Sequence, residues 1–248
     1  MIGRLRSLLF DAAFYGGSVP IVCAAPLAAL VGTGPLNAVV RTWLRWHRFC
    51  ARHIMGIHTR IEGRQLAGPA LYVAKHQSFF ETFELTLLLD HPVVVMKREL
   101  ADVPVWGRAA QAYGLIVVDR EASGAALKRL IREARLARAA GRPVLIFAEG
   151  TRVAPGEAPP LRAGFAGLYK ALDLPAVPIA LDSARVWPRH GPKRPGTVTI
   201  RFADPIAPGR PRAEAEALAY AGINALEPAA LPGSADTAPR SSPPSSER

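Results

Sequence analysis

The sequence predicts an α/β fold: a mixed, largely parallel sheet flanked by helices, preceded by an N-terminal helical membrane anchor. After Gly63, short apolar runs typical of buried strands alternate with longer segments of helical periodicity. This alternation indicates βαβ units, in which neighbouring strands run parallel. Upstream, residues 12–40 contain no Asp, Glu, Lys, Arg or His, and roughly 20 apolar residues are enough for a helix to span a bilayer.

The N-terminal apolar segment is interrupted by Pro20 and Pro26. The sequence therefore allows either a straight span or a bent, re-entrant segment. Arg4 and Arg6 precede the run, as they would in a cleaved secretory signal. The apolar stretch continues well past any such cleavage site, which favours an anchor.

Residues 36–54 have apolar side chains at helical spacing, with arginines on another face. One interpretation is a helix in the membrane interface, with Trp43 and Trp46 at the level of the lipid headgroups. The alternative is a helix packed on the domain with a solvated basic face. The arginines concerned are Arg41, Arg45, Arg48 and Arg52.

Six later segments have the short apolar character of strands: 71–74, 93–95, 115–118, 144–147, 176–179 and 197–202. The periodicity predicts helices between and after them: 79–89, 105–113, 124–140, 164–172 and 212–226.

Length and composition allow one domain with an appendage. The 248 residues are 50% hydrophobic, enough for a sizeable core. We expect anchoring helices in residues 1–60, one globular domain in 61–226 and a disordered tail in 227–248. Pro, Ser, Ala and charged residues dominate that tail and leave too little apolar surface to fold.

The net charge of +11 indicates an anionic partner, which could be nucleic acid, an anionic membrane surface or a phosphorylated substrate. We find no nucleic-acid recognition motif, and nucleic-acid binding would leave the apolar N-terminus unexplained. Cys23 and Cys50 form no CxxC pair, and the histidines match no metal motif. We therefore expect neither nucleic acid nor a metal.

His76 follows the first of these strands and opens the next helix, where side chains project beyond the sheet edge. Imidazole can take a proton from an alcohol, and a carboxylate on its other nitrogen fixes the tautomer. Glu81 is the candidate carboxylate. The alternative is that Ser78 and Glu81 form a capping box for the helix, a role compatible with the first.

Two further strand ends carry arginine. Arg120 can bind a phosphate with its fork of donors or pair with Asp119 on the surface. After strand 144–147, Gly150 permits close backbone approach, Thr151 offers a hydroxyl and Arg152 a guanidinium. A turn with a solvated arginine is the alternative. If the strands are parallel, these ends converge with His76.

Four blocks in this order resemble the glycerolipid acyltransferase family, specifically its 1-acylglycerol-3-phosphate acyltransferases. The similarity covers roughly residues 71–180. The family's first block is His, four residues and Asp, and here Glu81 stands at the Asp position. The longer side chain puts the geometry of the pair in question, but not its carboxylate chemistry. The other blocks are similar to residues 114–120, 149–152 and 177–179.

The resemblance implies direct acyl transfer without an acyl-enzyme or a bound cofactor. His76 would deprotonate the hydroxyl of a lysophospholipid acceptor, which attacks the thioester of acyl-CoA or acyl carrier protein, and Glu81 would orient His76. Lys97 would stabilise an oxyanion or bind phosphate, although a solvated lysine at a helix start is the alternative. The substrate-binding candidates are Arg120, Glu149, Gly150, Thr151, Arg152 and Lys97.

Several alternatives remain open at this point. The acceptor could be another lysolipid, such as lyso-ornithine lipid. A hydrolase using Ser78 lacks the G-x-S-x-G elbow, and a non-catalytic membrane-binding protein would not need His76. Membrane lipids are expected partners, with the active site at the cytoplasmic face of a membrane, the inner membrane if the protein is bacterial.

Overall fold

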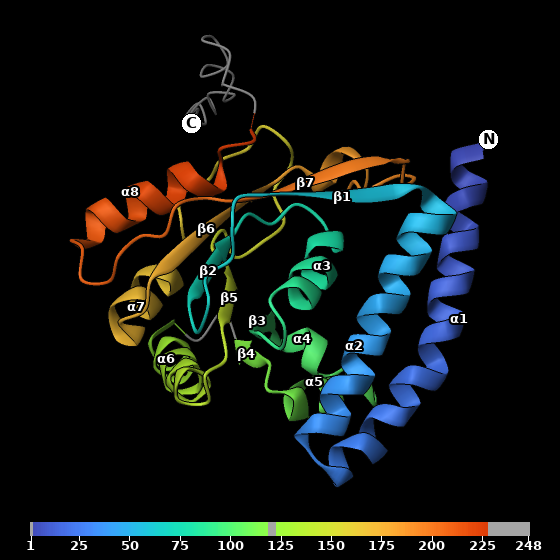
Figure 1. Ribbon diagram of the computed structural model, residues 1–248, viewed down its shortest axis with the longest axis horizontal. Helices are drawn as coiled ribbons and strands as arrows, with labels where there is room; N and C mark the ends of the chain where they lie inside the picture. The colour runs from blue at the N-terminus through green and yellow to red at the C-terminus, as the bar shows by residue number, and fades with distance from the viewer. Residues whose placement is uncertain (1, 119–122, 228–248) are drawn as a thin grey trace, which may run out of the picture.

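The computed structural model describes residues 2–118 and 123–227 (Figure 1). Within them, a seven-stranded sheet has the order β1-β7-β6-β2-β5-β3-β4. All neighbouring strands are parallel except β6 and β7, which confirms the mixed, largely parallel sheet. The strands are β1 Ile57–Glu62, β2 Leu71–Ala74, β3 Val93–Lys97, β4 Ile116–Val118, β5 Val144–Phe147, β6 Ala176–Leu181 and β7 Gly196–Phe202.

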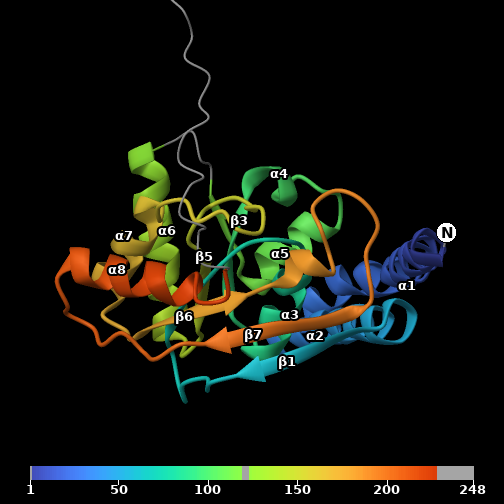
Figure 2. The ribbon, with the colours of Figure 1, turned by 90° about the horizontal axis from the view of Figure 1, so that it is seen from above.

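Helices cover both faces of the sheet, as the two views in Figures 1 and 2 show. One core cluster joins α1, α2 and α3 to one face, and a second joins α6, α7 and α8 to the other. The helices are α1 Ile2–Val31, α2 Thr33–Cys50, α3 Phe80–Leu88, α4 Arg98–Ala101, α5 Trp106–Tyr113, α6 Ser123–Ala139, α7 Ala163–Leu172 and α8 Arg212–Ile223, with a π-helical turn at Ala51–Met55 and a 3-10 turn at Ser183–Arg185.

The predicted strands and later helices are all present, with ends shifted by a few residues at most. The central strands are apolar along their whole length because helices cover both faces of a parallel sheet. The short helix α4 and the edge strand β1 were not predicted. The expected boundary between residues 60 and 61 falls inside β1, which belongs to the sheet.

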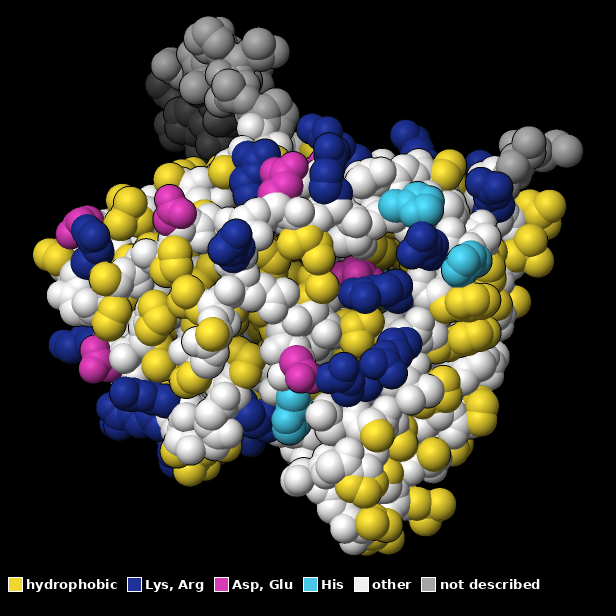
Figure 3. All heavy atoms as spheres, viewed as in Figure 1, with side chains coloured by type: hydrophobic (Ala, Val, Ile, Leu, Met, Phe, Trp, Pro, Cys, Tyr) yellow, Lys and Arg dark blue, Asp and Glu magenta, His cyan; other side chains and the backbone are white. Residues whose placement is uncertain are grey.

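Helix α1 continues unbroken through Pro20 and Pro26. It is long and apolar enough to cross a membrane by length and composition, and only 17% of its most apolar window is buried. Apolar side chains gather on the surface over α1 and α2, at the lower right of Figure 3.

Helix α2 packs against α1 with its aromatic face. Trp43 donates through Nε1 to the Ser18 hydroxyl at 2.8 Å, and the Trp46 indole lies so close to Gly17 that a Cβ there would sit 2.4 Å from Nε1. Both indoles thus take part in the contact between α1 and α2, and their place at the headgroup level of a membrane stays a prediction. The packed-helix interpretation fits α2 better.

Candidate active site

The carboxyl ends of β2, β5, β3 and β4 lie side by side because these strands are parallel neighbours. A cavity of about 1070 Å³ opens at this edge, and His76, Lys97, Thr151 and Arg152 line it. The structure thus brings together predicted residues from the ends of β2, β3 and β5. Arg120 lies outside the described residues.

His76 and Glu81 form a hydrogen-bonded pair, with 3.0 Å between His76 Nδ1 and Glu81 Oε1. The Glu81 carboxylate is fully buried. Burial on its own would raise the pKa of this carboxyl, but the hydrogen bonds and charge of His76 and the bonds from Ser78 lower it overall. Glu81 is therefore held as a carboxylate, and Nδ1 is the nitrogen that donates to it.

Glu81 also fills the capping role that the sequence allowed. Its Oε1 accepts from the backbone N–H groups of Gln77 at 2.7 Å and Ser78 at 2.6 Å. Its Oε2 accepts from the hydroxyls of Ser78 and Ser183, each at 2.7 Å. The longer side chain of glutamate is thus compatible with the pair, because it folds back from the first turn of α3 over this loop.

The imidazole of His76 is fixed on its other sides as well. It stacks on the Phe147 ring with 4.2 Å between centroids. The backbone N–H of His76 donates to Glu149 Oε2 at 2.9 Å, and the backbone carbonyl of His76 accepts from Val153 N at 2.8 Å. With Nδ1 turned to Glu81, Nε2 is the ring nitrogen that can serve a substrate in the cavity.

The turn after β5 forms one side of the cavity, which Gly150, Thr151 and Arg152 line. Gly150 has a φ of +68°, and a Cβ there would lie 3.1 Å from Arg162 Cγ, so both the conformation and the space favour glycine. The Arg152 guanidinium lies over the Phe79 ring, 4.4 Å from its centroid. Burial and the neighbouring Arg189 lower the pKa of Arg152.

Glu149 is the predicted binding residue that the structure places elsewhere. Its side chain is fully buried and is absent from the cavity wall. It accepts from Lys75 Nζ at 3.0 Å and from His76 N, and burial raises its pKa. Glu149 thus lies beneath the His76 loop, where it can support the site without touching a substrate.

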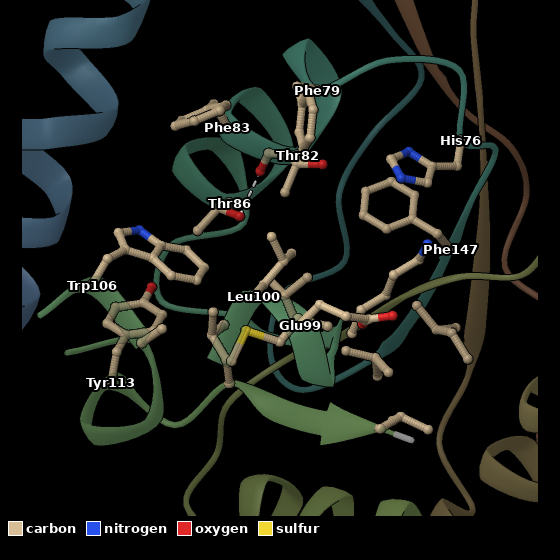
Figure 4. A pocket seen from close by; sticks show the side chains of 18 of the residues that line it. His76, Phe79, Thr82, Phe83, Thr86, Glu99, Leu100, Trp106, Tyr113 and Phe147 are labelled. Carbon is tan, nitrogen blue, oxygen red and sulfur yellow. Dashed lines mark hydrogen bonds between the residues drawn. The ribbon is translucent and has the colours of Figure 1, made fainter. Parts of the chain in front are cut away.

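The rest of the cavity is mostly apolar, although Thr82, Thr86 and Glu99 also line it, and it runs between the α1–α2 pair and α5. Figure 4 shows His76 and Phe147 at one end and Trp106 and Tyr113 at the other. From α1 and α2, its lining includes Ile21, Val22, Ala25, Val39, Val40 and Trp43. The cavity therefore offers a charged end beside the histidine and a long apolar arm. Among the described residues, no His, Cys, Asp and Glu side chains cluster as a metal site.

Sequence reasoning missed several residues of this site. Arg189 and Arg162 line the cavity, but both lie outside the motif blocks. Ser183 contacts Glu81 from a loop more than 100 residues away, and no local pattern marks it. Lys75 did carry a signal, since a charged residue directly after a buried strand needs a partner.

The family model described as Acyltransferase matches residues 56–182, more than half of the chain. The chain belongs to the acyltransferase family. The 1-acyl-sn-glycerol-3-phosphate acyltransferase of Pseudomonas aeruginosa is 35% identical over 165 residues, which span 65% of this chain and 64% of the relative. The alpha isoform from Mus musculus is 27% identical over 207 residues, which cover 80% of this chain and 72% of the relative.

Among solved structures, this acyltransferase is similar to the crystal structure of the 1-acyl-sn-glycerophosphate (LPA) acyltransferase PlsC from Thermotoga maritima. The TM-score is 0.68 at 18% identity, and the superposition covers 90% of this chain and 97% of the other. The fold is thus shared along nearly the whole length of both proteins. The alignment with the Pseudomonas relative, by contrast, spans somewhat less than two thirds of that protein.

Proposed function

We propose that this protein transfers an acyl chain from acyl-CoA or acyl carrier protein to the free sn-2 hydroxyl of 1-acylglycerol-3-phosphate, giving phosphatidic acid. The observation that carries the proposal is the pair of the cavity-lining His76 and the buried Glu81, 3.0 Å apart, at the junction of an apolar arm and an arginine-bearing turn. The acyl chain of a lysophospholipid fits the apolar arm, and its phosphate fits the arginine-bearing turn. The relatives named as 1-acyl-sn-glycerol-3-phosphate acyltransferases support the same choice.

In the proposed reaction, His76 Nε2 takes the proton of the acceptor hydroxyl while that oxygen attacks the thioester carbonyl carbon. The tetrahedral intermediate collapses with cleavage of the carbon–sulfur bond, and the leaving thiolate takes the proton back from the imidazolium. Glu81 stabilises the imidazolium and fixes Nδ1–H. No side chain becomes acylated, and no metal or bound cofactor takes part.

The acceptor phosphate would be held by Arg152 and by the Gly150–Thr151 turn. Arginine suits this role because its planar fork matches a phosphate. Lys97 lines the same cavity and would stabilise either the phosphate or the oxyanion. Arg120 stays a predicted member of this set.

We further propose that the protein works on a membrane, with its active site at the cytoplasmic face. The exposed apolar side chains of α1 support membrane association, with Leu27 68% and Leu30 85% exposed. Substrate and product are then both lipids of that membrane.

An acceptor panel tests the substrate assignment. Detergent-purified protein receives a labelled acyl thioester, as acyl-CoA or acyl carrier protein, with lysophosphatidate or lyso-ornithine lipid as acceptor. The proposal predicts labelled phosphatidic acid from lysophosphatidate. Product from lyso-ornithine lipid alone would replace the substrate and keep the chemistry, whereas no product from either would refute acyl transfer to these lysolipids.

A further inference from the structure

The residues around His76 are tied to the C-terminal end of α8. Lys75 and Gln77 flank His76 in the chain, and each contacts a residue about 150 positions further on. Lys75 Nζ donates to Asn224 Oδ1 at 2.8 Å, and Gln77 Nε2 donates to Glu227 Oε1 at 2.7 Å. Asn224 and Glu227 lie outside the four motif blocks and outside the segment that the family model matches.

Lys75 is a buried ammonium whose hydrogen bonds are fully used. Its side chain is 1% exposed, and Nζ donates to Glu149 Oε1 at 3.0 Å, the Glu157 carbonyl at 2.8 Å and Asn224. The Glu227 carboxylate lies 3.3 Å from Nζ. A buried charge is tolerated only when paired and hydrogen-bonded, so this geometry is closely constrained.

Glu227 joins this cluster to a second loop. Its Oε2 accepts from the backbone N–H of Gly156 at 2.5 Å, while its Oε1 accepts from Gln77 Nε2. The side chain of Glu227 is only 9% exposed. Although the sequence placed Glu227 in a disordered tail, it therefore fastens the end of α8 to the 154–157 loop and to the His76 loop.

We propose that Asn224 and Glu227 are positioning residues for His76, acting through Lys75, Glu149 and Gln77. We call these five residues the C-terminal clasp. The kinetic test of this positioning role rests on the proposed acyl transfer to lysophosphatidate.

The route from the clasp to the imidazole is short. Glu149 uses one carboxylate oxygen for Lys75 and the other for the His76 backbone N–H. Removing Glu227 leaves Lys75 with Glu149 as its one nearby carboxylate among the described residues, which draws Glu149 toward Nζ and away from His76. Gln77 loses its bond to Glu227 at the same time and keeps only the one that its Oε1 accepts from Ala184 N at 3.2 Å. Its backbone N–H is one of the donors that fix Glu81.

Kinetics on the 248-residue chain separate positioning from folding. We expect Glu227→Ala and Asn224→Leu to lower kcat about tenfold or more, because small displacements of a catalytic group have large effects on rate. KM for lysophosphatidate should stay within about twofold, since phosphate-binding side chains are untouched. Asn224→Asp retains an oxygen toward Lys75 Nζ and should recover most of the lost kcat.

Glu214→Gln is the matched control, because Glu214 lies on the same helix in an exposed pair with Arg210. It should leave kcat unchanged. Normal kcat in both Glu227→Ala and Asn224→Leu would overturn the proposal. So would a lowered activity fully explained by loss of folded protein, measured by circular dichroism and thermal unfolding.

A second readout does not depend on turnover. In protein with ¹⁵N-labelled histidine, the His76 ring resonances, assigned with His76→Ala, report the Nδ1 bond to Glu81. We expect them to shift in Glu227→Ala and Asn224→Leu and to stay in place in Glu214→Gln. Unshifted resonances in both clasp variants would overturn the positioning role of Asn224 and Glu227, whether or not the wild type is active. A wild type that is inactive on every acceptor would refute the proposed function instead.

Discussion

Glu81 concentrates much of the chemistry of this site in one side chain. Its carboxylate contacts His76 Nδ1, two backbone N–H groups and two serine hydroxyls. A glutamine at this position would keep the shape but place an amide N–H₂ against donors that need an acceptor. The residue is therefore a sensitive test of the proposed base.

We expect Glu81→Gln to lower kcat about 100-fold or more, because the imidazole loses both its fixed tautomer and the charge that stabilises its protonated form. Steady-state acyl transfer to lysophosphatidate measures this. His58→Ala, which removes an exposed imidazole on β1, should retain full activity. A Glu81→Gln enzyme within twofold of the wild type would show that Glu81 acts only as a helix cap.

His47 provides a pH-dependent test of packing. It is 1% exposed among Phe10, Phe14, Phe80, Phe83 and Trp187. Neither ring nitrogen has a hydrogen-bond partner in the described structure. Burial, with smaller effects from Arg48 and Lys193, lowers its pKa from 6.5 to about 3.

Between pH 6.5 and pH 3 the unfolded chain therefore binds a proton at His47 that the folded protein does not. As the pH is lowered through this window, the contribution of His47 should reduce the free energy of unfolding by about 1.4 kcal/mol per pH unit. Above pH 6.5 this contribution should not change with pH. His47→Phe should remove that contribution, and His58→Gln should not. Chemical denaturation across this pH range, with parallel slopes for the wild type and His47→Phe, would contradict the assignment.

The pair of helices α1 and α2 depends on a close approach at one glycine. A Cβ on Gly17 would meet the Trp46 indole at 2.4–2.8 Å, whereas a Cβ on Gly16 would have nothing within 4 Å. We expect Gly17→Ala to destabilise the protein by about 1–3 kcal/mol through overpacking. Gly16→Ala should be neutral or mildly stabilising because alanine favours helix.

Thermal unfolding in detergent compares the two variants directly. Their chemistry and helix propensity are the same, so only the contact with Trp46 distinguishes them. Equal melting temperatures for the two would mean that the α1–α2 contact is not as close as described.

Prediction from sequence succeeded where local pattern determines the element. The central strands are runs of Val, Ile and Leu because both faces of the sheet are covered. Strand β1 escaped because it lies at the sheet edge, with His58, Thr59 and Arg60 between its apolar residues. Helix α4 is too short for periodicity to reveal.

The same limit applies to the site. His76, Thr151 and Arg152 lie within a few residues of strand ends, so a parallel sheet alone predicts that they meet. The clasp residues Asn224 and Glu227 were not predicted from the sequence because their partners lie 149 and 150 residues away. No periodicity or spacing connects such positions, so that only the folded structure reveals them.

At the scale of the whole molecule, exposed large apolar side chains are most numerous on α1, and apolar side chains gather over α1 and α2 at the lower right of Figure 3. We expect Leu27→Arg combined with Leu30→Arg to weaken binding to vesicles of zwitterionic lipid, because burial of apolar area drives such binding. Leu136→Arg, at a 61% exposed position on α6, is the control. Vesicle flotation measures the bound fraction, and equal flotation of all variants would contradict membrane contact through α1.

The most direct test of the account is acyl transfer from a labelled acyl thioester to lysophosphatidate by the wild type, His76→Ala and His58→Ala. We predict labelled phosphatidic acid from the wild type and His58→Ala, and a loss of at least about 100-fold in His76→Ala. Transfer at the wild-type rate by His76→Ala would contradict the central claim that this imidazole is the base.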